Sequence, residues 1–309
     1  MTLTMARGKN KIFSDIYLLP IGSAQENING LAHLFEHLLV NHIRDSLKRS
    51  LFGYTTEDYI LIFCQGVDRG DFIKGLKSMK QVPGELLKEQ NSVIREIEEK
   101  GAQPGEIFFR EVWTGTRYEK SPQGTKESIT DITFKDITDL KEYILENNIY
   151  SFSVTRGIYV STSSSLISRQ KEKLPANKSF RYRESNYIVH FASDHIKQWQ
   201  IIEKILQLKN PTFHIQLSQK KEMAALVLEK GCNIPYDSEL NFYFDRAVSA
   251  LLEDFRLLEK KKVQLGVAEL RNIYFYNQKW SDYVLLLPKV PKEAIKKKIE
   301  TLRNHETDI

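Results

Sequence analysis

The chain has 309 residues, a formal charge of +5 and 41% hydrophobic residues, which excludes a disordered or fibrous protein and predicts a globular protein of two domains. Lysine and arginine are spread along the chain, so the basic charge does not favour nucleic-acid binding. No stretch approaches the roughly 18 apolar residues of a membrane span, and the first residues lack the apolar run of a secretory signal. Two cysteines allow at most one disulfide. We therefore expect a cytoplasmic protein that binds neither nucleic acid nor membrane.

The first half of the chain is predicted to combine strands and helices. Hydrophobic periodicity and turn residues predict, in chain order, a strand at 12–20, a helix from Leu31, a strand at 59–65, helices at 71–80, 85–101 and 133–147, and a strand at 150–157. The helix at 85–101 is bounded by the stop signals Gly101 and Pro104. This half is expected to form one domain, residues 1–165.

The second half repeats the mixture of strands and helices. Residues 161–179 are rich in Ser and Lys and are the candidate linker. Beyond it we predict a strand at 186–192 and helices at 196–208 and 237–258. The pattern indicates a second, smaller domain, residues 166–309.

The helix that begins at Leu31 carries a pattern typical of a metal site. Its residues run His33-Leu34-Phe35-Glu36-His37. Positions i and i+4 lie on one face of a helix, so the two imidazoles can bind one ion with Glu36 beside them. H-x-x-E-H is the inverted zincin signature, in which the carboxylate is the base for the water that zinc activates. Two buried imidazoles without a partner would be costly, which favours the metal interpretation.

A catalytic zinc usually takes three protein ligands, so a third must come from another part of the chain. The predicted helix at 85–101 offers four glutamates: Glu89, Glu96, Glu98 and Glu99. Glu89 and Glu96 are two helical turns apart beside the apolar face, whereas Glu98 and Glu99 point more towards solvent. Spacing leaves both Glu89 and Glu96 open as the third ligand.

The segment 21–39 (IGSAQENINGLAHLFEHLL) resembles the pitrilysin/insulinase family of zinc metallopeptidases. The likeness continues at 53–59 (GYTTEDY), 92–97 (SVIREI), 122–140 (PQGTKESITDITFKDITDL) and Gly157, which is expected to close a strand. It covers about residues 12–160.

The resemblance implies an α+β fold, a two-domain half in which each domain is a mostly antiparallel sheet covered by helices and the second is truncated. It implies one zinc ion per chain, with His33, His37 and Glu96 as ligands, Glu36 as the general base and Glu89 as an accessory glutamate. The interval between His37 and Glu96 is shorter than the family usually shows, so the intervening elements are expected to be trimmed.

The second half resembles the family less. Family members carry an Arg and a Tyr there that grip the substrate backbone. The nearest counterpart is 226–236 (LVLEKGCNIPY), which has Leu228 where the Arg would stand. Tyr236 is thus a candidate substrate-binding residue, and a structural role for it is an equal alternative.

These features predict a zinc metalloendopeptidase that hydrolyses short or unfolded peptides. The size resembles half-length bacterial members that mature ribosomally made peptides. Because the family builds its chamber from two such halves, the active species is expected to be a heterodimer with a second pitrilysin-like subunit, or else a homodimer. The alternative is a non-catalytic, peptide-binding partner subunit.

Overall fold

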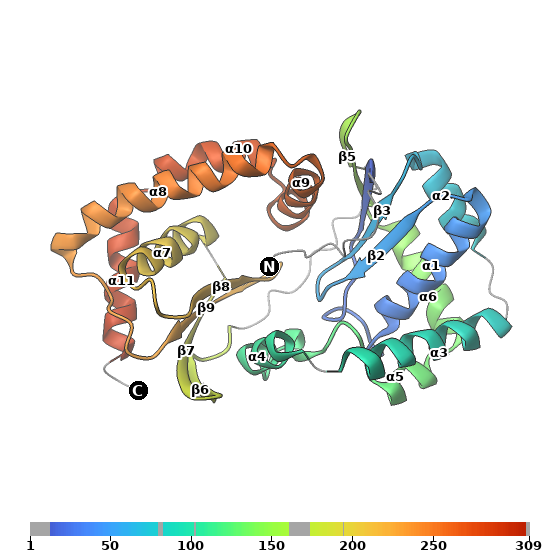
Figure 1. The fold of residues 1–309 in the computed structure, drawn as a ribbon, viewed down its shortest axis with the longest axis horizontal. Coiled ribbons are helices and arrows are strands. Elements are labelled where there is room, and N and C mark those ends of the chain that lie inside the picture. The colour runs from blue at the N-terminus through green and yellow to red at the C-terminus, as the bar shows by residue number, and fades with distance from the viewer. Residues whose placement is uncertain (1–12, 80–82, 102, 161–173, 194, 307–309) are drawn as a thin grey trace. The chain divides into compact units, whose positions relative to one another are not determined.

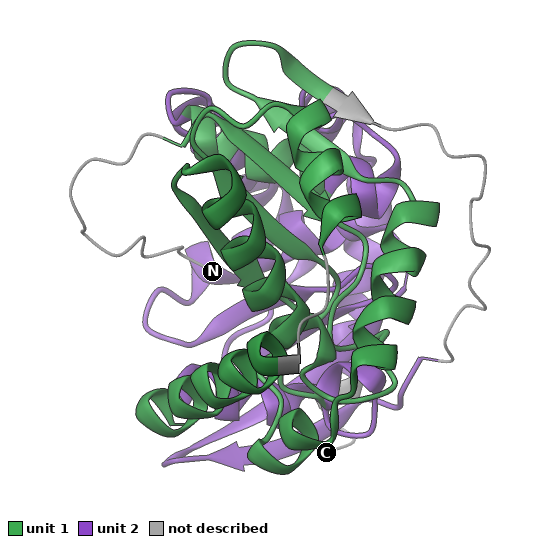
Figure 2. Ribbon diagram, turned by 90° about the vertical axis from the view of Figure 1, so that its right-hand side faces the viewer, with its two compact units in different colours: residues 1–103, 120–166, 262–271 green, residues 104–119, 167–261, 272–309 purple. Residues whose placement is uncertain are grey.

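The computed structural model describes residues 13–79, 83–101, 103–160, 174–193 and 195–306. The chain forms two compact units, coloured separately in Figure 2. Unit 1 comprises residues 1–103, 120–166 and 262–271, and unit 2 comprises 104–119, 167–261 and 272–309. Two short segments thus belong to the unit of the other half of the chain. The predicted division at 165/166 stays a prediction about independent domains.

Unit 1 contains a five-stranded sheet in the order β2-β3-β1-β4-β5, with every pairing antiparallel. The strands are β1 (Asp15–Leu19), β2 (Leu51–Thr55), β3 (Ile60–Cys64), β4 (Tyr150–Ser153) and β5 (Gly157–Val160). The single strand predicted at 150–157 is wrong: Gly157, with φ of 80°, opens β5 of a hairpin rather than closing a strand. Glycine reaches this left-handed conformation without steric cost, which permits the reversal.

The helices of unit 1 pack on one face of this sheet (Figure 1). They are α1 (Leu31–Leu47), α2 (Arg69–Ser78), α3 (Pro83–Lys100), α5 (Lys126–Asp131) and α6 (Phe134–Glu146). Alternate residues of β1 and β3, among them Leu19 and Ile62, share a buried cluster with Leu34 and Phe35 of α1. The apolar residues that recur with the helix period in α1 and with the strand period in β1 and β3 therefore pack into one common core.

Unit 2 contains a four-stranded antiparallel sheet in the order β6-β7-β9-β8. Its strands are β6 (Lys178–Tyr182), β7 (Ser185–Ala192), β8 (Ile215–Gln219) and β9 (Ala224–Glu229). Of the predicted linker, 161–173 lie outside the described residues, and its last two residues begin β6.

The helices of unit 2 are α4 (Pro104–Trp113), α7 (Ile196–Lys209), α8 (Asp237–Glu259), α10 (Trp280–Leu286) and α11 (Lys292–Glu306), with the 3-10 turns η1 (Arg117–Glu119) and η2 (Leu287–Lys289). Helix α9 (Lys262–Tyr276) is shared, because its residues up to Arg271 belong to unit 1. Helices combined with two antiparallel sheets confirm the predicted α+β class.

Two further findings concern membrane-spanning helices and the cysteines. Within the described ranges, no helix is long and apolar enough to cross a membrane. Cys64 and Cys232 are both buried free thiols. They lie in different units, Cys64 in unit 1 and Cys232 in unit 2.

Candidate metal centre

A buried carboxylate fixes the start of α1. Glu26 accepts hydrogen bonds from the backbone N–H groups of Gly30 and Ala32, at 2.6 and 2.8 Å. These amides have no partner within the helix, and Gly30 has no side chain to cap them. Burial raises the pKa of Glu26 to about 7, although both amide hydrogen bonds oppose the shift. Glu26 therefore sets where the helix that carries the two histidines begins.

Two glycines bring a second segment close to the same helix end. Gly30 has φ of 88°, and a Cβ there would lie 2.9 Å from the Cα of Gly124. This close approach places the neighbouring Gln123 carbonyl 3.2 Å from Nδ1 of His33. Since a carbonyl oxygen can only accept, Nδ1 must carry the proton, which leaves the lone pair on Nε2 of His33.

His33, His37 and Glu96 converge although Glu96 belongs to another helix, α3. Each of the three offers a ligand atom, and these atoms all lie within 4.8 Å of one another. Nε2 of His33 is 3.9 Å from Oε1 of Glu96, and Nε2 of His37 is 3.2 Å from Oε2 of Glu96. Helices α1 and α3 lie side by side (Figure 1), which brings the third donor to the histidines.

The donor set fits a zinc ion. Zinc binds imidazole nitrogen and carboxylate oxygen at about 2.0–2.2 Å, so two ligands of a tetrahedral site lie about 3.4 Å apart. The separations of 3.2 and 3.9 Å lie on either side of this value. Two nitrogens and one oxygen also leave the open fourth position of a catalytic site. Small movements of the His33, His37 and Glu96 side chains would bring their ligand atoms to the separations of a tetrahedral zinc site.

Of the other predicted glutamates of α3, Glu89 faces the histidines, whereas Glu98 and Glu99 face solvent. Oε2 of Glu89 is 3.7 Å from Nδ1 of His37, on the ring nitrogen opposite Glu96. Glu89 is buried, and a carboxylate in this place can orient a ligating imidazole. Glu98 and Glu99 are exposed, and Glu98 pairs with Lys126 at 3.1 Å.

Glu36 is buried beside the cluster in a space that β2 leaves open. A Cβ on Gly53 would lie 2.0 Å from Oε1 of Glu36, so the carboxylate occupies the volume that a side chain would fill. The Thr55 hydroxyl donates to Oε2 of Glu36 at 3.2 Å. Burial raises the pKa of Glu36 to about 7, against the opposing effects of His37 and Thr55. A carboxylate with this pKa can take up and release a proton near neutral pH.

The ionisation of the three donors is strongly unequal. Burial, reinforced by the adjacent His37, lowers the pKa of His33 to about 4. For His37, burial lowers the pKa, but the hydrogen bond to Glu96 and the nearby carboxylates outweigh it, and the net pKa is raised. The hydrogen bond from His37 lowers the pKa of Glu96 to about 2. Zinc binds a neutral imidazole, so metal binding at this cluster competes with a proton on His37.

The cluster lies at one end of a pocket of about 380 Å³. The pocket extends along α1 and is bordered by all five residues of β2, Leu51–Thr55. Among the strands of the described chain, β2 lies at the edge of its sheet and pairs only with β3. The site is therefore open beside a strand with one free edge.

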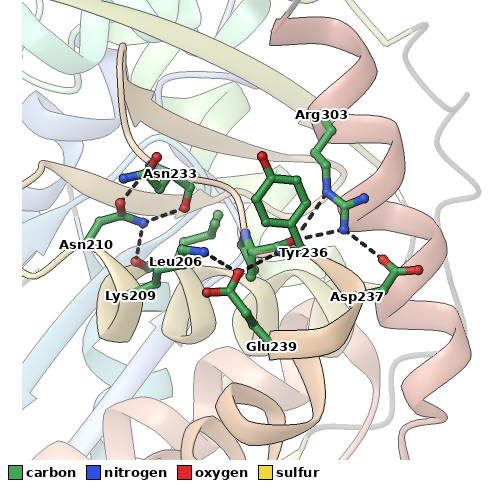
Figure 3. Close-up of polar contacts among 9 residues, drawn as sticks. Leu206, Lys209, Asn210, Asn233, Tyr236, Asp237, Glu239 and Arg303 are labelled. Carbon is green, nitrogen blue, oxygen red and sulfur yellow. Dashed lines mark hydrogen bonds and ion pairs between the residues drawn. The ribbon is translucent and has the colours of Figure 1, made fainter.

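The remaining predicted residue, Tyr236, belongs to unit 2 rather than to this cluster. It precedes α8, is 68% exposed, and its ring lies between the cations of Lys209 and Arg303, 5.8 and 5.7 Å from its centroid. Arg303 donates to the Pro235 carbonyl and to Oδ1 of Asp237, at 2.8 Å each. Figure 3 shows Arg303 beside Tyr236 and Asp237. These contacts fix the start of α8. Contact of Tyr236 with substrate stays a prediction.

Leu228, at the position that the resemblance assigns to an arginine, is a core residue. It lies in β9, opposite Ile188 of β7 and Ile215 of β8, and is fully buried. A charged side chain would have no access to solvent there.

Several residues of the site could not be found from the sequence. Gln123 contributes a backbone carbonyl, which any residue could supply, and Gly53 contributes an absent side chain. Thr55 lies within the short resemblance at 53–59, which pointed to the right segment but to no role. Glu26 lies within the segment 21–39 that carries the resemblance, and the resemblance assigned it no role, although an acidic side chain just before a helix start is a recognisable capping signal.

Comparisons with known proteins identify the fold. No family model and no curated protein matches the sequence. An M16-like peptidase from Alicyclobacillus acidocaldarius superposes with a TM-score of 0.67 at 13% identity, over 92% of this chain and 88% of that one. A peptidase M16 inactive domain from Pseudomonas fluorescens has a TM-score of 0.56 at 14% identity, over 94% and 89%. Pitrilysin has a TM-score of 0.55 at 13% identity, and 94% of this chain covers 41% of it.

These likenesses establish the fold as that of M16-like peptidases. The chain has about the length of the first two proteins and less than half the length of pitrilysin. One of the three is named an inactive domain, so the fold by itself does not imply catalysis.

Proposed function

We propose that the protein is a zinc-dependent peptidase of the pitrilysin/insulinase type. The observation that carries the proposal is the convergence of His33, His37 and Glu96, with ligand atoms within 4.8 Å, beside the buried Glu36. In this proposal the three donors hold one zinc ion per chain, and Glu89 orients His37 from the opposite ring nitrogen. The shared fold with M16-like peptidases supports it.

A bound zinc ion would supply Lewis-acid chemistry, polarising a carbonyl and acidifying a water molecule. Glu36 is the general base: it accepts a proton from the attacking water and later donates it to the nitrogen of the leaving amine. Burial raises the pKa of Glu36 and thereby opposes the charged form, which favours uptake of the proton from water. Thr55 holds the carboxylate by its hydrogen bond to Oε2, and Gly53 leaves the room in which the carboxylate lies.

The substrate class we propose is an unfolded or short peptide. Such a peptide would add as a further strand to the free edge of β2, where main-chain hydrogen bonds give affinity with little dependence on sequence. Leu51–Thr55 border the pocket along its length, which supports binding beside this strand. Maturation of a ribosomally made peptide would be one such reaction.

We also propose that the active form pairs this chain with a second pitrilysin-like subunit, or with a copy of itself. A lone half would leave the metal cleft open to water and would lack the arginine that Leu228 replaces. Unit 2 exposes large apolar side chains that a partner could cover, among them Phe242, Leu257 and Leu285. A cytoplasmic location stays a prediction.

Metal content and cleavage, measured on the same preparation, test the proposal. Purified protein should contain about one zinc per chain and should hydrolyse members of a library of unstructured peptides. Glu36→Gln should retain zinc and lose cleavage by at least about 1,000-fold, since the general base is removed but no ligand is. Hydrolysis by Glu36→Gln above a few per cent of the normal rate would remove Glu36 from the mechanism.

The alternative is a non-catalytic subunit that binds peptides or a partner protease. The likeness to a peptidase M16 inactive domain favours keeping it. The two functions differ in one measurement: a binding subunit would bind peptides without cleaving them, with or without zinc.

A further inference from the structure

The pocket beside the metal cluster is a groove whose two long walls run in opposite directions. One wall is α1, which contributes His37 at the metal end and Arg44 at the other. The opposite wall is β2. Thr55 lies at the metal end, since it bonds Glu36, and Leu51 therefore lies at the Arg44 end. Chain direction along β2 is thus from Arg44 towards the metal.

This direction sets the orientation of a peptide that joins β2. Every pairing in the sheet is antiparallel, and antiparallel pairing is the more stable arrangement. An antiparallel peptide runs from the Thr55 end towards the Leu51 end. The residues that follow the cleaved bond therefore pass Arg44.

The distance from His37 to the guanidinium of Arg44 can be counted in peptide residues. Arg44 Nη2 donates a hydrogen bond to Oδ1 of Asn41, as expected for a helix side chain that leans towards the N-terminus. Asn41 lies four residues after His37, or about 6 Å along the helix axis. Two residues of an extended strand span about 6.6–6.8 Å and point to the same face. A peptide whose cleaved bond lies beside His37 would thus bring the second residue after that bond level with the guanidinium.

The charges of the groove select the sign of that residue. Glu36 and Glu96 are committed to the metal end, and the other described residues that line the groove include no carboxylate. Apart from the proposed metal ligands and Glu36, the described lining residues that carry charge near neutral pH are Arg44 and Lys100, both cationic, since the raised pKa of Tyr54 keeps its phenol neutral. Lys100 pairs with Glu96. An acidic peptide side chain beside Arg44 would therefore meet a cation and no competing acid of the lining.

We propose that Arg44 is a specificity-determining residue that binds the carboxylate of a peptide's second residue after the cleaved bond. The substrates are then peptides with Asp or Glu at that position. This inference rests on the proposed peptidase function. A basic residue in the last turn of α1 also suits the helix dipole, but that role affects stability and not the choice of peptide.

Pairs of peptides that differ at one position test the inference. Each pair carries Glu or Gln at the second residue after the cleaved bond, and a third peptide carries Lys. We compare kcat/KM for the unaltered protein, and peptide affinity for zinc-loaded Glu36→Gln, which measures the preference without turnover. Arg44→Gln and Arg44→Glu are the test variants. Arg49→Gln, an exposed arginine outside the groove lining, is the matched control.

The Glu peptide should be preferred over the Gln peptide by about fivefold, an effect typical of one partly exposed ion pair. Arg44→Gln should bring the ratio to about one, and Arg44→Glu should favour the Lys peptide, while Arg49→Gln keeps the preference. Equal use of Glu and Gln peptides by an active enzyme overturns the inference and leaves the peptidase standing. No cleavage of any peptide overturns the peptidase, and no charge preference in binding by Glu36→Gln then overturns the role of Arg44 as well.

Discussion

The two units are built on one chain plan but bury different chemistry. In unit 1, β1, α1, β2 and β3 follow one another, and the strands are ordered β2-β3-β1 in the sheet. In unit 2, β7, α7, β8 and β9 follow in the same way and are ordered β8-β9-β7. Helix α1 buries His33 and Glu36, whereas the buried residues of α7 are apolar: Trp199, Ile201, Ile202, Ile205 and Leu206.

The comparison of α1 with α7 separates the residues that the fold requires for packing from those that only the candidate site requires. Unit 2 shows that this plan folds around an apolar helix. Burying an imidazole and a carboxylate costs free energy, and the raised pKa of Glu36 and the lowered pKa of His33 both reflect that cost. The polar residues of α1 are therefore not required by packing, which supports the proposed metal site.

The largest expected effect is loss of the metal when a ligand of unit 1 is removed. His33→Ala and Glu96→Gln should lower zinc affinity by several orders of magnitude, because each leaves only two donors. Zinc content after dialysis against a chelator is the measurement. Glu98→Gln, on the same helix but exposed, is the control and should keep its zinc. Normal zinc binding by Glu96→Gln would exclude Glu96 as a ligand.

A smaller loss is expected at the carboxylate behind His37. Glu89→Gln should weaken zinc affinity or activity by about 10- to 100-fold, the range typical of a residue that orients a ligating imidazole. Zinc titration and kcat measured together separate a defect in binding from one in turnover. An effect as large as that of Glu96→Gln would make Glu89 a ligand instead.

A partner is the next way to test the contrast, because the described residues of unit 2 include no group of potential metal ligands like that of unit 1. We expect weak cleavage by the isolated monomer and a gain when a second pitrilysin-like subunit, or a second copy, associates with it. Size-exclusion chromatography combined with activity at several protein concentrations is the measurement. Full activity in a strict monomer contradicts the dimer.

Leu228 tests whether unit 2 could carry the missing arginine. Leu228→Ala should lower the free energy of unfolding by about 2–5 kcal/mol, as for other buried leucines, and Leu228→Arg should cost more because it buries a charge. Phe242→Ala, at an exposed position of the same unit, should change it by less than about 0.5 kcal/mol. Urea denaturation measures all three. A stable, active Leu228→Arg variant would show that this core position tolerates a clamp residue.

The smallest effect concerns Glu203, a partly buried carboxylate of unit 2 that lies outside the candidate metal centre. Burial raises the pKa of Glu203 to about 7, although the Leu217 amide and the nearby Lys204 oppose it. A raised carboxyl pKa means that stability is full below pH 4.5, the ordinary value, and declines as the pH rises through 7. Glu203→Gln should lack this decline, a difference of up to about 3 kcal/mol. Parallel pH profiles of Tm for both proteins would contradict the assignment.

Local pattern was sufficient for elements whose burial repeats with a helix or strand period. The predicted helix at 85–101 and the strand at 59–65 correspond to α3 and β3 within a few residues. The hairpin of β4 and β5 was predicted as one strand because its turn is short. The first two residues of β6 fell within the predicted linker and the rest of the strand was not predicted, because every residue of β6 is exposed or only partly buried. Elements buried on one side by distant partners leave a weak local signal.

By itself, the sequence determined that His33, Glu36 and His37 share one helix and one neighbourhood, since that follows from the helix period alone. Its apolar patterns also indicated a mixture of strands and helices, whereas the α+β fold class was an expectation that the family resemblance implied. Only the tertiary structure decided which glutamate meets the histidines, because that depends on how α3 packs against α1. The Gln123 carbonyl, the Gly53 opening and the Arg44 end of the groove likewise arise from contacts between segments far apart in the chain, which no local periodicity encodes.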